Sequence, residues 1–224
     1  MSLETGHDIT GHEITVNGCS VTILPIIKGL VSESEKVEGM LKNDFDIFAV
    51  ALGPEEIEGI RQRGELVVEK DECGDDVRIM SDIDLVYGKH LMTFGKINVP
   101  VPAYCTLIDA CVERSVDVVP LDMNDELFSE VYCDTVTTFE LLREKGLVKK
   151  GLKKKFDLSS PEAFVEEWDD HVNTIKGFRA VSELRERYIA LQIVKNCVPG
   201  KRMLALIEHE RIFGIWDILE NNDV

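Results

Sequence analysis

Short β-rich runs alternate with helical patterns along the chain. Two such runs in residues 14–27 flank Asn17-Gly18, a dipeptide that tolerates the positive φ angles of a tight hairpin turn. Three further apolar runs are bounded by polar, glycine or proline residues, as buried parallel strands are; they cover residues 45–52, 116–122 and 203–207. The pattern therefore predicts an opening hairpin followed by three core strands.

Apolar residues at helical spacing separate these strands. Ser32 and Glu35 form a predicted capping box for the first helix, and Pro102 and Pro161 mark two later helix starts. Helices are predicted at residues 34–41, 55–61, 102–111, 125–133, 134–144, 160–168, 178–194 and 212–219. Residues 64–87 are predicted to be irregular, with an edge strand near Val67-Val68. The alternation predicts an α/β fold: a mainly parallel central sheet with helices on both faces and an N-terminal β-hairpin.

The length of 224 residues and the 44% hydrophobic content suffice for one sizeable core. We therefore expect a single compact α/β domain over residues 1–224, with residues 1–12 as a flexible tail. The apolar stripe of the last predicted helix is typical of core packing; the alternative is an exposed face that forms a homodimer. Its members are Ile212, Ile215, Trp216 and Leu219.

The chain has 42 acidic and 25 basic residues, a net charge of -17, and this charge repels phosphate backbones and anionic membranes over most of the molecule. We therefore expect no nucleic acid and no membrane as partners. The N-terminal residues lack the basic start and apolar stretch of a signal peptide, which predicts a cytoplasmic location. The sequence contains no nucleophile elbow, phosphate-binding loop or dinucleotide fingerprint.

Polar residues follow the predicted core strands, and in parallel sheets such positions meet at one edge. Lys28 and Gly29 are candidate ligand-binding residues, because they precede a helix whose free N–H groups attract anions. Asp122 and Asp125 are candidate ligands for a divalent metal such as magnesium. The alternative is that these loops are an ordinary turn and a helix cap.

The densest polar cluster follows the last predicted strand directly. Glu208, His209 and Glu210 are candidate catalytic residues together with Asp122, since they combine carboxylates with a group that titrates near neutrality. Arg185 and Arg211 are candidate ligand-binding residues that would hold a carboxylate or a phosphate. The alternative for the candidate catalytic residues and for the two arginines is that they are ordinary charged residues of a loop or of a helix surface.

Three segments, residues 21–52, 102–122 and 181–215, resemble the TraB/PrgY pheromone-shutdown family, which is related to the Tiki proteases and to erythromycin esterase and ChaN-like proteins. The resemblance is clearest at the end of the chain, where the family has a Glu-Arg-Asn helix, a strand and a Gly-x-x-His-x-x-Gly-Ile turn. Five residues match that pattern, namely Arg185, Tyr188, Ala190, Gly214 and Ile215. Asp122 is also retained.

Most diagnostic polar residues of that family are replaced here. Residues 26–29 stand where the family has Gly-x-x-His, and Val50-Ala51-Leu52-Gly53 lacks both acids of its Val-Glu-Leu-Asp motif. The Gly-Glu pair falls on Val101-Pro102, and the final His falls on Arg211. The resemblance implies the same sheet architecture and a metal or acid-base mechanism that does not survive in its original form.

Two functions follow from these observations. The first is a catalytically altered or non-catalytic relative of this family that binds a small ligand or a protein partner at the carboxyl edge of the sheet. The alternative is a metal-dependent hydrolase that uses Asp122, Asp125, Glu208 and His209, with Arg185 orienting an anionic group of the substrate.

Overall fold

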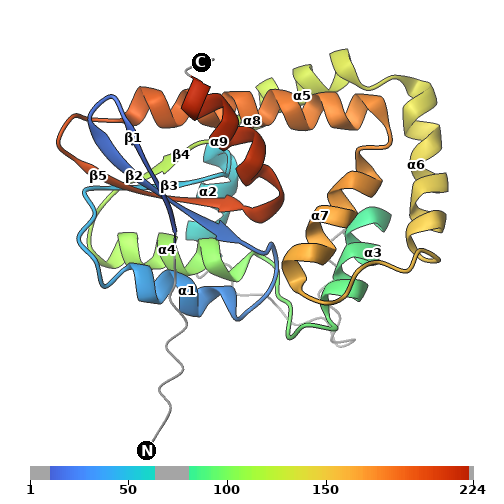
Figure 1. Ribbon diagram of the computed structural model, residues 1–224, viewed down its shortest axis with the longest axis horizontal. Helices are drawn as coiled ribbons and strands as arrows, with labels where there is room; N and C mark the ends of the chain where they lie inside the picture. Colours follow the sequence, from blue (N-terminus) through green and yellow to red (C-terminus); the bar gives the residue numbers. More distant parts are fainter. Residues whose placement is uncertain (1–10, 64–80, 222–224) are drawn as a thin grey trace, which may run out of the picture.

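The computed structural model describes residues 11–63 and 81–221 (Figure 1). Its five strands are β1 (His12–Val16), β2 (Cys19–Ile26), β3 (Ile47–Val50), β4 (Val118–Pro120) and β5 (Arg202–Glu208). Its helices are α1 (Glu33–Met40), α2 (Pro54–Gln62), α3 (Asp82–Leu91), α4 (Pro102–Glu113), α5 (Asp125–Thr135), α6 (Thr138–Gly151), α7 (Pro161–Val172), α8 (Lys176–Asn196), the 3₁₀ helix η1 (His209–Arg211) and α9 (Ile212–Asn221).

The strands form one mixed sheet in the order β1-β2-β5-β3-β4. β2, β5, β3 and β4 run parallel to one another, and β1 pairs antiparallel with β2. The hairpin between β1 and β2 is confirmed, and its turn residues Asn17 and Gly18 have φ angles of 49° and 76°. The predicted α/β class with an N-terminal hairpin is therefore correct.

Successive residues of the core strands pack into two different apolar clusters, as the alternation of side chains in a strand requires. Leu204 and Leu206 of β5 belong to a cluster with residues of α1, α2 and α4. Met203, Ala205 and Ile207 belong to a cluster with residues of α8 and α9. Figure 1 shows α8 and α9 above the sheet and α1 and α4 below it.

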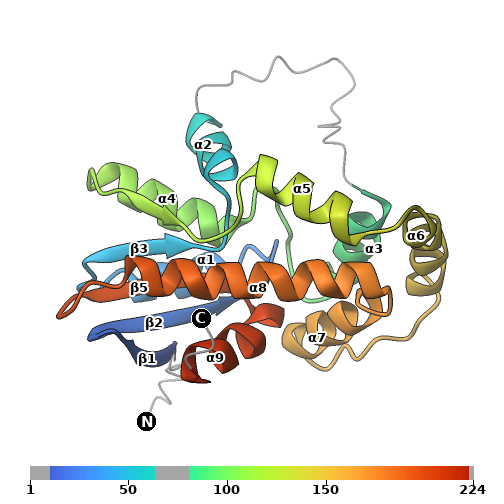
Figure 2. The same cartoon turned by 90° about the horizontal axis from the view of Figure 1, so that it is seen from above.

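A third apolar cluster lies beyond the carboxyl end of the sheet. It joins Ile27 and Leu30, which follow β2, to α3, α7 and the segment around Phe156. In Figure 2 the long helix α8 runs alongside both the strands and this helical group. The carboxyl ends of the strands therefore face a group of helices, and polar residues at that junction are partly shielded from water.

The last helix packs into the core. Ile215 and Leu219 of α9 are 0% and 5% exposed, and Ile212 and Trp216 pack against the same cluster as partly buried residues. This stripe is accounted for by core packing and gives no support to a homodimer through that face.

Two local predictions are wrong. Residues 82–91 form the helix α3 instead of irregular chain, because Ser81 caps it by accepting a hydrogen bond from the Asp84 N–H (3.1 Å). Ser32 does not form the predicted capping box: its own backbone is helical (φ -62°, ψ -21°) and its side chain makes no cap hydrogen bond. Most of the predicted tail and the edge strand near Val67-Val68 lie outside the described residues, while His12 opens β1.

Within residues 11–63 and 81–221, no helix is both long enough and apolar enough to cross a bilayer.

Candidate functional site

Glu208 lies at the centre of the sheet edge where the parallel strands have their carboxyl ends. β5 lies between β2 and β3, and Glu208 is its last residue, in register with Ile26 of β2. Side chains from α4, η1 and α8 reach the same edge. Because β5 is an interior strand, a residue at its carboxyl end is surrounded by neighbouring elements, and Glu208 is only 6% exposed.

Unpartnered buried polar atoms gather at this edge. Five buried side-chain nitrogen and oxygen atoms of the described residues have no hydrogen bond of ordinary geometry, and four of them belong to Tyr104, Glu208, Glu210 and Arg211. Glu208 Oε2 lies 3.6 Å from Arg211 Nε, which is beyond hydrogen-bonding distance. Buried polar groups are normally satisfied. Several unsatisfied polar atoms at one place therefore indicate a position where a polar group of a ligand could bind.

The same residues influence one another electrostatically. Burial and the neighbouring Glu208 carboxylate raise the pKa of Glu210 to about 7. Burial, with the charge of Glu208 and a weak hydrogen bond of the hydroxyl to that carboxylate, raises the pKa of the fully buried Tyr104 hydroxyl far above its ordinary value. Two carboxylates and a phenol thus share one shielded space, with Arg211 beside them and the guanidinium of Arg185 also close enough to interact with Glu208.

Asp122 is fully engaged by protein groups. Arg185 Nε donates to Asp122 Oδ2 (2.9 Å), Arg185 Nη2 donates to the same oxygen, and the Met123 N–H donates to Asp122 Oδ1 (2.8 Å). Asp122 is 4% exposed, so this is a buried ion pair that ties β4 to α8. Both carboxylate oxygens accept hydrogen bonds from the protein, and the ion pair holds two parts of the fold together.

The three candidate residues after β5 point to different neighbours. Glu208 faces Tyr104 and Arg211, whereas His209 Nε2 lies 2.9 Å from Glu166 Oε1 of α7. Glu208 and Glu210 are therefore brought together, and His209 is directed to the helix beside them. Asp122 is nearby, because its charge and that of Glu208 both raise the pKa of Arg185.

Glu186 and Asp169 extend the cluster, and the sequence analysis did not single out either acid. Burial raises the pKa of Glu186 to about 7, with Arg211 opposing the shift and Asp169 adding to it. Arg211 Nη1 donates to the Ser182 hydroxyl (3.2 Å) on the same face of α8. Tyr104 was also missed, because it occupies an ordinary position in the apolar stripe of α4.

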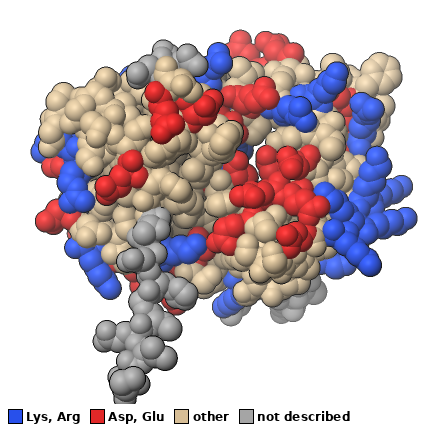
Figure 3. All heavy atoms as spheres, viewed as in Figure 1, with Lys and Arg blue, Asp and Glu red and all other residues tan. Residues whose placement is uncertain are grey.

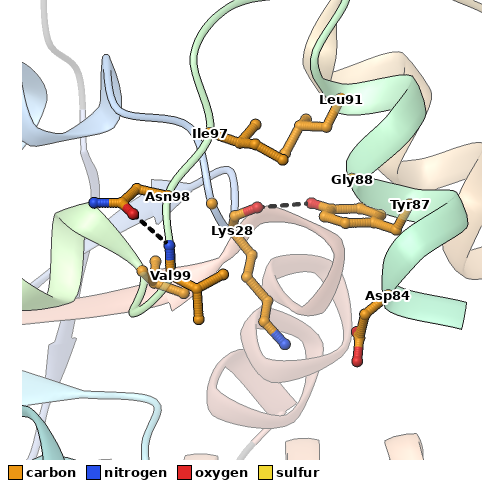
Figure 4. Close-up of a pocket in the computed structure, with 10 residues that line it drawn as sticks. Lys28, Asp84, Tyr87, Gly88, Leu91, Ile97, Asn98 and Val99 are labelled. Carbon is orange, nitrogen blue, oxygen red and sulfur yellow. Dashed lines mark hydrogen bonds between the residues drawn. The ribbon is translucent and has the colours of Figure 1, made fainter. Parts of the chain in front are cut away.

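A pocket adjoins this cluster at the end of β2. It has a volume of about 240 Å³ and apolar walls, and Figure 4 shows Lys28 and Asp84 pointing to the same side of it. The Tyr87 hydroxyl donates to the Lys28 carbonyl (3.1 Å), and the charges of Glu210 and Glu208 contribute to the raised pKa of Tyr87. Tyr87 therefore lines the pocket and lies close enough to the buried acids to interact with their charges, although burial is the largest cause of its raised pKa.

Lys28 and Gly29 line this pocket. The Ile27 N–H donates to Glu33 Oε2 (3.1 Å) at the start of α1, so a carboxylate of the protein already occupies that position. Gly29 adopts a φ of 102°, a backbone conformation that glycine reaches without strain and other residues rarely adopt.

The described residues contain no group of three or more His, Cys, Asp and Glu side chains arranged to hold a metal ion. Asp125 lies in the first turn of α5, where its N–H donates to Glu55 Oε2 (3.3 Å), and Asn124 caps that helix. The helix-cap alternative thus accounts for Asn124.

Comparison of the sequence with protein-family models and with curated proteins finds no match to either.

Proposed function

We propose that the protein binds a small ligand at the carboxyl edge of its sheet, through a positively charged or hydrogen-bond-donating group of that ligand. Glu208 and Glu210 would accept from this group, and the Tyr104 hydroxyl would lie beside it. The adjoining pocket, with its apolar walls, would hold the rest of the ligand. The protein would be a catalytically altered or non-catalytic relative of the TraB/PrgY family.

The observation that carries this proposal is the buried cluster of Tyr104, Glu208, Glu210 and Arg211, in which Tyr104 and Arg211 approach Glu208 but one polar atom of each side chain has no hydrogen bond of ordinary geometry. Leaving a buried polar group unsatisfied costs about 1–3 kcal/mol. A ligand that donates hydrogen bonds to Glu208 and Glu210 would recover part of that cost on binding. A cation would do more, because it would also offset the repulsion between the two carboxylates.

Loss of the original catalysis is supported by two features. Arg211 stands where the family has its final His, and Asp122, which is retained, has both carboxylate oxygens engaged by Arg185 and Met123. A residue held in this way is not available to activate water without breaking a buried ion pair. The site is therefore better suited to holding a ligand than to acid-base chemistry.

The metal-dependent hydrolase is a second candidate, favoured by the proximity of acids from different elements. Besides burial, which is the largest cause, the charges of Asp122 and Glu208 contribute to the raised pKa of Glu56 on α2. A divalent ion between these acids would relieve the repulsion. In that function His209 would have to leave Glu166.

The proposal takes the chain as one α/β domain with helices on both faces of the sheet, acting in the cytoplasm, with small molecules or proteins as partners. The packing of α1 and α4 into one cluster and of α8 and α9 into another supports this arrangement.

A thermal-shift screen tests the two candidates together. Primary amines and guanidinium compounds with a short apolar body are compared with divalent metal ions, using the wild type, Glu208→Gln and the control Glu130→Gln, whose side chain is exposed on α5. We expect an amine to raise the Tm of the wild type and of the control but not of Glu208→Gln. A Tm raised by a divalent ion alone, and lost in Glu208→Gln, would replace this function with the hydrolase.

A further inference from the structure

A second pocket lies far from the sheet edge, between α6 and the end of α7. Its volume is about 310 Å³. The residues that line it are Arg143, Gly146, Leu147, Lys150, His171, Thr174 and Ile175. Two of these side chains are cations and none is acidic, although the chain as a whole carries a net charge of -17. The pocket thus has the opposite charge to the molecule that contains it.

The two cations reach the pocket from one stripe of α6. Arg143, Gly146 and Lys150 are spaced three and four residues apart, which places them on the same side of a helix. Neither Arg143 nor Lys150 makes an ion pair or a side-chain hydrogen bond within residues 11–63 and 81–221. Gly146 between them leaves the space open, since a Cβ atom there would meet nothing within 4 Å.

Glu140, one of the two acids of α6, interacts with the charge of Arg143 but makes its hydrogen bonds to other groups. Glu140 accepts hydrogen bonds from the Thr137 N–H (3.0 Å) and the Gly177 N–H (2.8 Å). These bonds lower the pKa of Glu140 and hold its carboxylate against the helix start. The positive charges at the pocket are therefore not neutralised by a hydrogen-bonded carboxylate.

The opposite wall carries polar side chains. His171 is 9% exposed and its Nε2 lies 3.1 Å from the Leu147 carbonyl, while the Thr174 hydroxyl donates to the His171 carbonyl (2.8 Å). Leu147 and Ile175 supply apolar surface beside these groups. The pocket thus combines two cations with a small apolar wall.

The surroundings concentrate positive charge on this pocket. Residues 143–155 contain seven of the 25 Lys and Arg residues of the chain. Figure 3 shows them gathered at the right of the molecule, over α6. A local positive field of this kind attracts small anions even when the net charge of the protein is negative, because charges beyond about 8 Å are screened at physiological ionic strength.

We propose that this pocket binds a small molecule bearing an oxyanion, with a phosphate monoester as the best match. The Arg143 guanidinium presents a planar fork of donors and the Lys150 ammonium a point charge, a combination that suits phosphate oxygens. A short carbon skeleton would pack on Leu147 and Ile175. This site is independent of the ligand at the sheet edge, which it neither requires nor contacts.

The test compares two pairs of cations on the same helix. Binding of inorganic phosphate and of glycerol phosphate is measured by titration calorimetry in a buffer free of other oxyanions, for the wild type and for two double variants. Arg143→Ala with Lys150→Ala removes the pocket cations. Lys145→Ala with Lys149→Ala removes the same charge from exposed positions outside the pocket. We expect at least tenfold weaker binding for the first pair and less than threefold for the second.

A third variant checks the position of the ligand. Gly146→Glu adds a carboxylate at a position where a Cβ atom meets nothing within 4 Å, and it should abolish binding while circular dichroism shows that the helices are intact. Equal losses in the two double variants would show a diffuse basic surface instead of a site and would overturn the proposal. Absence of phosphate and glycerol phosphate binding by the folded wild type would overturn it as well.

Discussion

At the scale of single residues, the Asp122–Arg185 ion pair fixes the loop after β4 to α8. Removing the carboxylate leaves the Arg185 guanidinium, which is 24% exposed, without its partner. We expect Asp122→Ala to lower the free energy of unfolding by about 3 kcal/mol, the usual cost of breaking a buried pair. Urea denaturation of both proteins measures this loss.

The control for this change is Asp125→Ala. Asp125 is exposed in the first turn of α5, so its loss should cost less than about 1 kcal/mol. Equal losses for the two variants would contradict a structural role that is specific to Asp122.

Glu186 and Glu210 make stability depend on pH in a defined direction. Both have a pKa of about 7 in the folded protein against 4.5 when unperturbed, so the folded state binds more protons than the unfolded state between these values. The free energy of unfolding should therefore fall as the pH rises from about 5 to 8, by on the order of 2–3 kcal/mol for each of the two groups.

The double variant Glu186→Gln, Glu210→Gln isolates this contribution, because all other titrating groups are shared with the wild type. Chemical denaturation at several pH values should show a smaller loss of stability with rising pH in the variant. Parallel pH profiles for the two proteins would mean that these carboxyl groups titrate at ordinary values.

Sequence reasoning located part of the candidate site at this scale. Glu208, Glu210 and Arg211 were found because they directly follow a buried strand, a position that topology sends to the sheet edge. Tyr104 and Glu186 were missed, since an aromatic residue in an apolar stripe and an acid on a helix surface carry no local signal. Their proximity arises from tertiary packing.

At the scale of elements, two glycines of the α2 region test how tightly that helix packs. A Cβ atom on Gly59 would meet nothing within 4 Å, whereas one on Gly53 would collide with the Met123 carbonyl oxygen. Gly59→Ala should stabilise the protein by about 0.5–1 kcal/mol through helix propensity. Gly53→Ala should destabilise it by about 1–3 kcal/mol through overpacking.

Thermal unfolding of the two variants beside the wild type measures both effects. Both changes add one methyl group to the same helix or its cap, and only the one at Gly53 meets the Met123 carbonyl, so a loss of stability at Gly53 reports that contact. Stabilisation by both would show that α2 does not lie against the loop after β4.

Most elements could be predicted where a local signal marks their ends. The Asn17-Gly18 turn, the proline at the start of α4 and the Ser160 cap of α7 all lie where the sequence placed them. α3 was not predicted, because residues 64–87 were interpreted as one irregular segment. Asp82 and Asp84 lie in its first turn, where they favour a helix start.

At the scale of the whole molecule, alternation of strands and helices was sufficient to predict the mixed, mostly parallel sheet. It did not predict that α3, α6 and α7 gather beyond the carboxyl end of the strands, since that arrangement depends on the contacts of Ile27 and Leu30 with α3 and α7. This helical group shields Glu208 and Glu210 and also carries the basic surface of α6. Both proposed binding sites therefore depend on it.

The central claim is that a donor group of a ligand is held between Glu208, Glu210 and Tyr104. A crystal structure of the protein with the amine that raises its Tm most tests this directly. We expect the amine nitrogen within hydrogen-bonding distance of Glu208 Oε2 and its apolar body toward Tyr87 and Lys28. An amine bound elsewhere, with Glu208 and Glu210 contacting only ordered water, would contradict the account.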